Sequence, residues 1–306
     1  MDRTIRKAVF PVAGMGTRFL PATKAMAKEM LPVVDKPLIQ YAVEEAVSAG
    51  IEQVIFVTGR GKRSIEDHFD HQDGLEDQLL AKGKDELAAV YREVSDMAEV
   101  IYVRQKQPLG LGHAVWCARH AVGDEPFAVL LPDDLMDDTA GAIARMKAAY
   151  EASGASQIAV EPVAPEGVDS YGVIDPGTFN GETYPVKGLV EKPDPAVAPS
   201  NLAVIGRYVL SPTVFEPLSR ATTGAGGEIQ LTDALQALIT EYGEAIHGYP
   251  FPGARFDCGS KLGYLKAQVE FGLRRSDFGA ELGDYLRERI QATEAGTAAS
   301  GSGSGR

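Results

Sequence analysis

The feature that most constrains the fold is a short apolar run that leads directly into a glycine loop near the beginning of the chain. Residues 8–12, AVFPV, have the length and composition of a buried strand. Residues 13–18, AGMGTR, follow without a break, and two glycines at this spacing let the backbone turn sharply and approach a ligand closely. Because the peptide N–H groups of such a loop can bind phosphate, we predict a phosphate-binding loop at the end of a buried strand.

The segments that follow predict a parallel sheet with connecting helices. Residues 38–47 carry the apolar face of a helix with Asp35 as its cap, and residues 53–58, QVIFVT, form the next buried strand. A strand, a helix and a strand in this order make a right-handed βαβ unit. The remaining elements of this half are a charged helix at 64–95 and strands at 100–104 and 127–131.

Three cations follow the glycine loop in a chain that is otherwise strongly acidic. The chain has 30 Lys and Arg against 43 Asp and Glu, a net charge of −13, yet Arg18, Lys24 and Lys28 lie close together. An acidic protein that binds polyanions has to concentrate its cations locally. The same net charge argues against nucleic acid and against an anionic membrane surface as partners.

The composition also indicates the cellular compartment of the protein. No apolar run is as long as a membrane span, and we expect no signal peptide before the first strand. Cys117 and Cys258 are too few for a disulfide framework, so we expect a reducing, cytoplasmic environment. Residues 296–306 are rich in glycine and serine and predict a disordered tail.

Two polar groups come directly after predicted strands, where α/β sheets bind ligands. Gln105 follows the strand at 100–104, and its amide can both donate and accept, as the edge of a pyrimidine requires. A glycine turn that contains Gly110 comes next. Asp133 follows the strand at 127–131, and its carboxylate suits Mg²⁺; a helix cap is the other interpretation, and it is stronger for Asp134.

From about residue 156 the pattern changes from strand–helix to strand–turn–strand, and we interpret residues 156–260 as a sugar-binding half. Its sharpest feature is Glu191-Lys192-Pro193, in which the carboxylate can hold two sugar hydroxyls and the lysine a sugar phosphate. Neighbours on a regular strand point to opposite faces, so both can reach one pocket only if the strand ends or bulges there, which Pro193 makes plausible. An exposed ion pair is the alternative.

The last part of the sequence predicts a segment that supports the site, a short strand and two helices. Residues 227–233, GEIQLTD, begin a helix that Thr232 or Asp233 could cap, and we expect it to support the site rather than to do chemistry. Residues 256–259, FDCG, end a short strand, and Cys258 reads as a small buried residue. Amphipathic helices are predicted at 260–274 and 281–291.

A glycine loop of this kind is compatible with several protein classes. A dinucleotide-binding fingerprint needs a third glycine where Phe19 stands, and a P-loop needs a spacing that residues 61–64, GKRS, do not have. Residues 14–41, GMGTRFLPATKAMAKEMLPVVDKPLIQY, instead resemble the opening of bacterial UTP–glucose-1-phosphate uridylyltransferases. The other motifs occur in that family's order between about residues 6 and 278, with Ala27 where the family usually has proline.

The resemblance implies a single α/β domain over 1–295, with a nucleotide-binding half at 1–155, the sugar-binding half at 156–260 and C-terminal helices at 261–295. Its sheet would be Rossmann-like, mixed and mostly parallel, flanked by helices, with a smaller β-rich sugar-binding part. The resemblance further implies Mg²⁺ as cofactor and a homo-oligomer, dimer or tetramer. The implied reaction is UTP plus α-D-glucose 1-phosphate giving UDP-glucose and pyrophosphate.

The resemblance also implies roles for individual residues. The catalytic residues would be Arg18, Lys28, Asp133 and Lys192. The nucleotide-binding residues would be Ala13, Gly14, Gly16, Thr17, Glu29, Gln105 and Gly110. The sugar-binding residues would be Gly172, Glu191 and Lys192, and the metal ligands Asp133 and Asp257. Enzymes of the same fold that use dTTP, CTP or GTP, or another sugar 1-phosphate, are the nearest alternative; a non-catalytic nucleotide-binding regulator and an NAD-dependent oxidoreductase are more distant ones.

Overall fold

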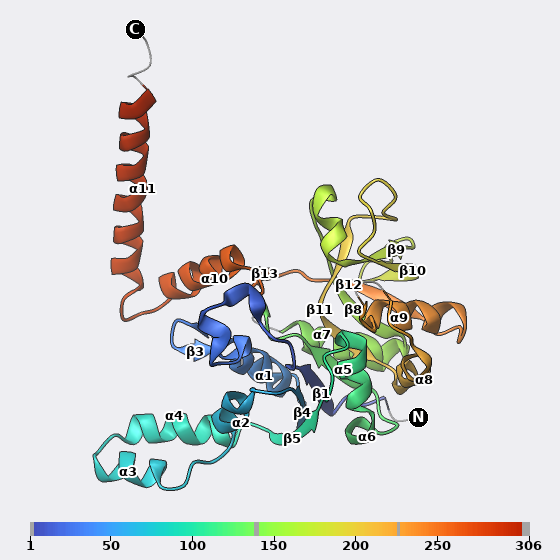
Figure 1. The fold of residues 1–306 in the computed structure, drawn as a ribbon, viewed down its shortest axis with the longest axis horizontal. Helices are drawn as coiled ribbons and strands as arrows, with labels where there is room; N and C mark the ends of the chain where they lie inside the picture. The colour runs from blue at the N-terminus through green and yellow to red at the C-terminus, as the bar shows by residue number, and fades with distance from the viewer. Residues whose placement is uncertain (1–2, 138–140, 225–226, 302–306) are drawn as a thin grey trace.

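The computed structural model describes residues 3–137, 141–224 and 227–301, and its core is one nine-stranded sheet (Figure 1). The order of the strands is β5 (Glu99–Arg104), β4 (Gln53–Thr58), β1 (Lys7–Pro11), β6 (Phe127–Leu130), β11 (Leu202–Leu210), β8 (Ser156–Pro162), β12 (Ile246–Pro250), β10 (Tyr184–Glu191) and β9 (Gly172–Pro176).

The sheet is mixed, as the resemblance implies. β5, β4, β1 and β6 pair in parallel, which confirms the predicted βαβ arrangement of the first half. β11 is antiparallel to both β6 and β8, and β10 is antiparallel to both β12 and β9, whereas β12 and β8 are parallel. Parallel pairing therefore dominates only the first half, and the second half is mainly antiparallel.

Helices cover both faces of the sheet because successive strand residues point to opposite sides. Val9 packs in a core beneath α5, α8 and α9, while Ala8 and Phe10 pack in a second core beneath α1, α2 and α7. The helices are α1 (Leu38–Ser48), α2 (Arg63–Phe69), α5 (Leu111–Cys117), α6 (Arg119–Val122), α7 (Ala142–Ser153), α8 (Phe215–Arg220) and α9 (Leu231–Thr240). Short 3-10 turns are η1 (Thr17–Phe19), η2 (Ala22–Lys24), η3 (Lys28–Met30), η4 (Pro165–Ser170) and η5 (Pro212–Val214).

Two expectations for the first half were wrong in detail. Asp35 does not cap α1, because β2 (Pro32–Val33) and β3 (Lys36–Pro37) form a small hairpin whose turn contains it. The predicted helix at 64–95 is α2 followed by α3 (Leu75–Ala81) and α4 (Asp85–Ser95). Gly74 and Gly83 separate these helices in a left-handed conformation, φ +75° and +66°, that interrupts a helix.

A second two-stranded sheet joins β7 (Asp134–Asp137) to β13 (Ala254–Asp257), and the C-terminal helices follow it. α10 (Lys261–Leu273) packs near the glycine-loop side, and α11 (Gly279–Gly301) projects away from the body of the molecule (Figure 1). The helix extends through residues 296–301, where a disordered tail was predicted; alanine, the best helix former, occupies 292, 295, 298 and 299. Residues 302–306 lie outside the described residues.

Across the described residues, no helix combines the length and apolar character that crossing a membrane requires.

Candidate active site

The glycine loop and the ends of β5 and β6 enclose a cavity of about 360 Å³. The loop leaves β1 with the Val12 N–H still bonded to the carbonyl of Val57, and the Gln105 N–H bonds to the carbonyl of Thr58, so both segments continue from paired strands. Six of the predicted residues line this cavity together: Ala13, Gly14, Lys28, Gln105, Gly110 and Asp133. The sheet therefore brings together groups that are separated by more than a hundred positions.

A second cavity, of about 270 Å³, has Lys28 and Asp133 in common with the first. Its other lining residues are Gly16, Thr17, Arg18, Phe19 and Gly259. Two cations, a glycine loop and a carboxylate around one space are the features of a site for several phosphates and a metal ion.

Lys28 and Asp133 form an ion pair between the two cavities. Burial alone would lower the pKa of Lys28, but the charges of Asp133 and Glu29 raise it above its usual value. Burial alone would raise the pKa of Asp133, but the charge of Lys28 outweighs it, and the pKa lies below its usual value. Both side chains are therefore charged at neutral pH.

Gly16 is the loop glycine whose conformation matters most. Its φ is +65°, and a Cβ there would lie 3.0 Å from the Cβ of Lys28, so a larger residue would push the lysine away. The Thr23 hydroxyl donates to the Gly16 carbonyl at 2.7 Å and holds the loop in this position. The glycine loop and Lys28 are thus packed as one unit.

Asp133 and Asp257 converge on one point beside Gly259. A Cβ on Gly259 would lie 3.0 Å from an oxygen of Asp257 and 3.1 Å from an oxygen of Asp133. The Cys258 N–H donates to the Asp133 carbonyl at 2.8 Å, and the Gly259 N–H donates to Asp257 at 3.0 Å, so the backbone fixes both segments. Two hard oxygen donors around a space that only glycine leaves open fit Mg²⁺, which keeps several waters and takes phosphate oxygens as well.

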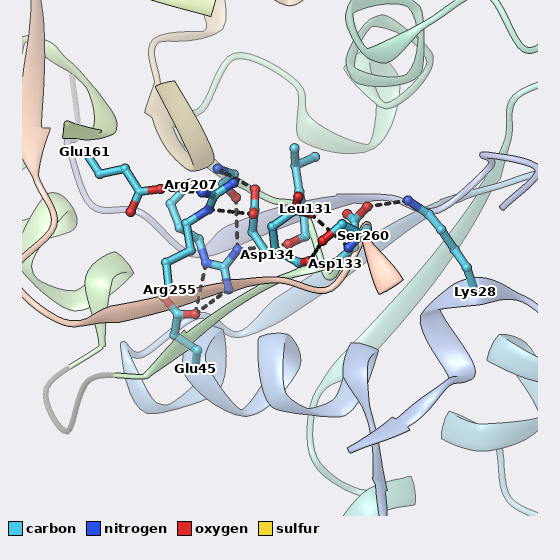
Figure 2. A network of polar contacts seen from close by, with 12 residues as sticks. Lys28, Glu45, Leu131, Asp133, Asp134, Glu161, Arg207, Arg255 and Ser260 are labelled. Carbon is cyan, nitrogen blue, oxygen red and sulfur yellow. Dashed lines mark hydrogen bonds and ion pairs between the residues drawn. The ribbon is translucent and has the colours of Figure 1, made fainter. Parts of the chain in front are cut away.

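Asp134 points the other way, into a buried network of charges (Figure 2). It accepts a hydrogen bond from Arg255 at 2.7 Å and another from the Gly206 N–H at 3.0 Å, so it is not the helix cap that was considered. Arg255 also pairs with Glu161. Behind them the Arg207 guanidinium, 1% exposed, pairs with Glu45 at 2.8 Å.

The sugar-side residues meet at the end of β10. Lys192 has φ +48°, so the strand ends at Glu191 and the two side chains no longer point to opposite faces. The Lys192 ammonium lies 3.6 Å from one oxygen of Glu191, and the Thr232 hydroxyl donates to the other at 2.7 Å. A Cβ on Gly172 would lie 2.8 Å from the Thr232 hydroxyl, so glycine is required there. The end of the strand at Glu191 therefore meets the condition, stated from the sequence, under which Glu191 and Lys192 can reach one pocket.

Residues 228–232, which we call the bracing segment, connect the two halves of the site. Ile229 exchanges backbone hydrogen bonds with the Gly110 turn, donating to the Leu109 carbonyl at 2.7 Å and accepting from the Gly112 N–H at 2.9 Å. Three residues later, Thr232 holds Glu191. These contacts fit the supporting part that the sequence predicts, but the sequence indicates only that Thr232 can cap a helix and does not predict its contact with Glu191.

Glu29 lies deeper than the other predicted nucleotide-binding residues. Its side chain is 1% exposed and one oxygen pairs with the Lys62 ammonium at 2.7 Å, while Oε1 has no hydrogen-bond partner among the described residues. Burial raises the pKa of Glu29, and the charges of Lys62 and Lys28 oppose that rise. Lys62, part of the rejected P-loop candidate, is thus the counter-ion of Glu29, which its place in the sequence does not reveal.

The comparisons with known proteins agree with this geometry. The family model described as "Nucleotidyl transferase" matches residues 7–271. A UTP–glucose-1-phosphate uridylyltransferase of Bacillus subtilis (strain 168) is 50% identical over 292 residues, which is 95% of this chain and 99% of the relative. The chain belongs to the UTP–glucose-1-phosphate uridylyltransferases of the nucleotidyl transferase family.

Solved structures of such uridylyltransferases have the same fold. A UTP-bound UGPase from Acinetobacter baumannii is 47% identical, with a TM-score of 0.85, over 93% of this chain and 99% of that one. A UDP-glucose pyrophosphorylase complexed with UDP-glucose is 46% identical, with a TM-score of 0.81, over 89% of this chain and 100% of that one. These findings confirm the family and the fold expected from the motifs.

Proposed function

We propose that this uridylyltransferase holds UTP in the two adjoining cavities and joins it to α-D-glucose 1-phosphate held at the end of β10, giving UDP-glucose and pyrophosphate. The observation that carries the proposal is the Lys28–Asp133 pair, which belongs to both cavities and so lies where the triphosphate has to pass from one to the other. The sugar phosphate attacks the α-phosphorus in line, and pyrophosphate leaves on the opposite side.

The uracil would lie in the first cavity, against Gln105 and the Gly110 turn. An amide there can recognise the edge of a pyrimidine. Oε1 of Glu29, which has no partner in the part of the chain that the structure describes, is a further acceptor and lies within the electrostatic reach of Lys28. A carboxylate that is already neutralised by Lys62 can accept from a neutral base without bringing uncompensated charge into the site.

The triphosphate would lie along the glycine loop toward the second cavity. Its oxygens would accept hydrogen bonds from the N–H groups of the loop that contains Ala13, Gly14, Gly16 and Thr17, and they would pair with Arg18 and Lys28. Positive charge that is fixed in advance stabilises the extra negative charge of the transition state and of the leaving pyrophosphate. Nη1 of Arg18 would lie 3.6 Å from a Cβ on Gly259, so Arg18 would pair with the pyrophosphate end of the triphosphate.

Asp133 and Asp257 would hold Mg²⁺ in the space beside Gly259. When bound there, the ion would neutralise charge on the phosphate oxygens. The Asp133 oxygen that faces this space is the one that pairs with Lys28, so the lysine and the ion would share it, and Asp257 would supply the other carboxylate oxygen. Among the described residues there is no group of three or more His, Cys, Asp and Glu side chains that could hold a metal by themselves, which fits a site that relies on substrate oxygens.

The glucose 1-phosphate would lie against Gly172, Glu191 and Lys192. Glu191 would accept from two sugar hydroxyls, and Lys192 would pair with the attacking phosphate. A phosphate monoester is largely ionised near neutral pH, with a second pKa of about 6, so the reaction needs no general base. Alignment of two anions is therefore the main task of the protein.

We also propose a homo-oligomer, dimer or tetramer, that works in the cytoplasm with UTP and glucose 1-phosphate as its small-molecule partners. The C-terminal helices leave apolar side chains exposed, among them Leu262 and Leu265 on α10 and Tyr285 and Ile290 on α11. A second copy of the chain would cover them. Sedimentation of the wild type and of a Leu265→Asp, Ile290→Asp double variant would test this, since the double variant should dissociate.

The function is tested by the release of pyrophosphate from UTP, dTTP, CTP and GTP, each with glucose 1-phosphate, with and without Mg²⁺. We expect release from UTP to be fastest and to require the divalent ion. Faster release from another nucleotide would replace UTP as the substrate, and undiminished release after removal of divalent ions would remove the metal from the proposal.

A further inference from the structure

The amide of Gln105 is fixed from two directions on the side away from the base. Its Nε2 lies 3.2 Å from the carbonyl oxygen of Gly110 and 2.9 Å from Nδ1 of His113. A carbonyl oxygen only accepts hydrogen bonds, so the amide nitrogen, and not the amide oxygen, has to face Gly110. This assigns the orientation of the amide from chemistry rather than from the similar shapes of its two ends.

The same nitrogen faces His113, which fixes the protonation of the imidazole. Because Nε2 of Gln105 donates, Nδ1 of His113 has to accept, and the ring is neutral with its proton on Nε2. That Nε2 points toward the Cys117 sulfur, a weak acceptor 3.8 Å away. Burial lowers the pKa of His113 and outweighs the backbone of Gln107, which raises it, so the net shift favours a neutral ring.

The remaining atom of the Gln105 amide is its oxygen, and Gln105 lines the first cavity. An amide oxygen accepts from the N3–H of uracil. Cytosine has a lone pair at N3, which would face that oxygen and repel it. Turning the amide over to suit cytosine would set its oxygen against the Gly110 carbonyl and break both bonds of the nitrogen.

His113 itself is held firmly. It lies on α5, directly after the Gly110 turn, and its ring stacks on Trp116 with 6.1 Å between ring centroids and 25° between planes. Gln105 is 7% exposed, so water cannot readily replace the acceptor if the imidazole is removed.

We propose that His113 is a specificity-determining positioning residue, whose unprotonated Nδ1 holds the Gln105 amide with its oxygen toward the base and so makes the enzyme prefer UTP to CTP. This inference rests on the proposed function, since it assumes that the base lies in the first cavity. His113 acts through Gln105 and does not itself contact the nucleotide.

The test is a matched pair of variants, His113→Leu and His113→Asn. The two new side chains have nearly the same shape, but only asparagine has an oxygen that can accept where Nδ1 stood. For each enzyme, kcat/KM is measured with UTP and with CTP, and KM is measured with glucose 1-phosphate. We expect His113→Leu to reduce the UTP-to-CTP ratio about tenfold, mainly through KM for UTP, and His113→Asn to restore most of it. The KM for glucose 1-phosphate should not change.

Equal UTP-to-CTP ratios in the wild type and His113→Leu would overturn the inference, and so would equal losses in both variants, which would indicate packing alone. A wild type that does not use UTP with glucose 1-phosphate would instead contradict the proposed function. Nitrogen NMR of the wild type labelled at its five histidines gives a second readout that does not depend on the folding of His113→Leu. The signals lost in His113→Asn should show an unprotonated Nδ1; a proton on that nitrogen would overturn the inference.

Discussion

Arg255 on β13 donates to Asp134 on β7 across 2.7 Å, directly behind the two carboxylates that converge beside Gly259. In the same two-stranded sheet, Asp257 is the register partner of Asp134, and Asp133 precedes Asp134 in the chain. One buried pair therefore braces the segments that carry both proposed metal ligands, while neither Arg255 nor Asp134 is among the residues that line the two cavities.

Replacing Arg255 with methionine should destabilise the protein strongly. Asp134 and Glu161 would lose their counter-ion in a site where the arginine side chain is only 7% exposed, and breaking a buried pair costs about 3–5 kcal/mol. Urea unfolding measures the change. The matched control is Arg220→Met, which breaks an exposed pair, 70% and 61% exposed, and should cost less than about 1 kcal/mol. If Arg255→Met and Arg220→Met lowered the free energy of unfolding equally, the buried ion pairs of Arg255 would contribute no more to stability than an exposed pair does.

Gly259→Ala should weaken metal binding with little change in stability. The added methyl would lie 3.0–3.1 Å from an oxygen of Asp257 and of Asp133, in the space where the ion is proposed to sit. Mn²⁺ binding in the presence of UTP, followed by electron paramagnetic resonance, gives the affinity, which we expect to fall at least about tenfold. Asp133→Asn is the companion variant and should also lose affinity. Unchanged Mn²⁺ binding in both would exclude this point as the metal site.

Lys192→Ala should lose at least about a hundredfold in turnover while UTP binding stays close to that of the wild type. The lysine is assigned to the attacking sugar phosphate, and its left-handed backbone, φ +48°, brings it to the same side as Glu191. Steady-state kinetics and calorimetric titration with UTP separate the two effects. Lys187→Ala, an exposed lysine on the same strand, serves as the control. Near-normal turnover of Lys192→Ala would remove Lys192 from this role.

Thr232→Val should raise the KM for glucose 1-phosphate about tenfold, because one oxygen of Glu191 loses the hydroxyl that donates to it and the carboxylate is no longer oriented. Thr232→Ser keeps the hydroxyl and should behave like the wild type. The KM for UTP should remain the same in both variants. If Thr232→Ser were as impaired as Thr232→Val, packing of the methyl group and not the hydrogen bond would explain the loss.

Cys258 should be almost unreactive in the native protein. It is 2% exposed, and burial together with the neighbouring carboxylates Asp133, Asp134 and Asp257 raises its pKa to about 12. In a Cys117→Ser variant, the reaction of the remaining thiol with a disulfide reagent at pH 8 should be at least about a thousandfold slower in buffer than in urea. Equal rates in buffer and in urea would show that the thiol is accessible and ionised.

The sequence was sufficient for the family, the mixed α/β fold and the grouping of residues around the first cavity. Gln105 and Asp133 could be placed together because each follows a strand, and strands of a parallel sheet end at one edge. The condition on Glu191 and Lys192 could also be stated in advance, since strand geometry alone requires a break there. The individual roles of these residues stay predictions.

The contacts that hold the site together could not be predicted in the same way. Arg255 reaches Asp134 and Glu161 across 121 and 94 positions of the chain, and no periodicity relates residues so far apart. Lys62 belongs to a glycine-rich stretch whose spacing excludes the motif it resembles, so nothing marks it as the partner of Glu29. The sequence pattern predicts one helix at 64–95 in place of α2, α3 and α4, because the left-handed conformation of Gly74 and Gly83 is fixed only in the folded chain.

The bracing segment makes the two subsites mechanically dependent on each other. A displacement of Ile229 caused by a nucleotide in the first cavity has to cross only three peptide bonds to reach Thr232, which donates to Glu191. Binding of the nucleotide in the first cavity should therefore change the affinity for glucose 1-phosphate at Glu191, and the reverse. The two substrate affinities are then coupled and not independent.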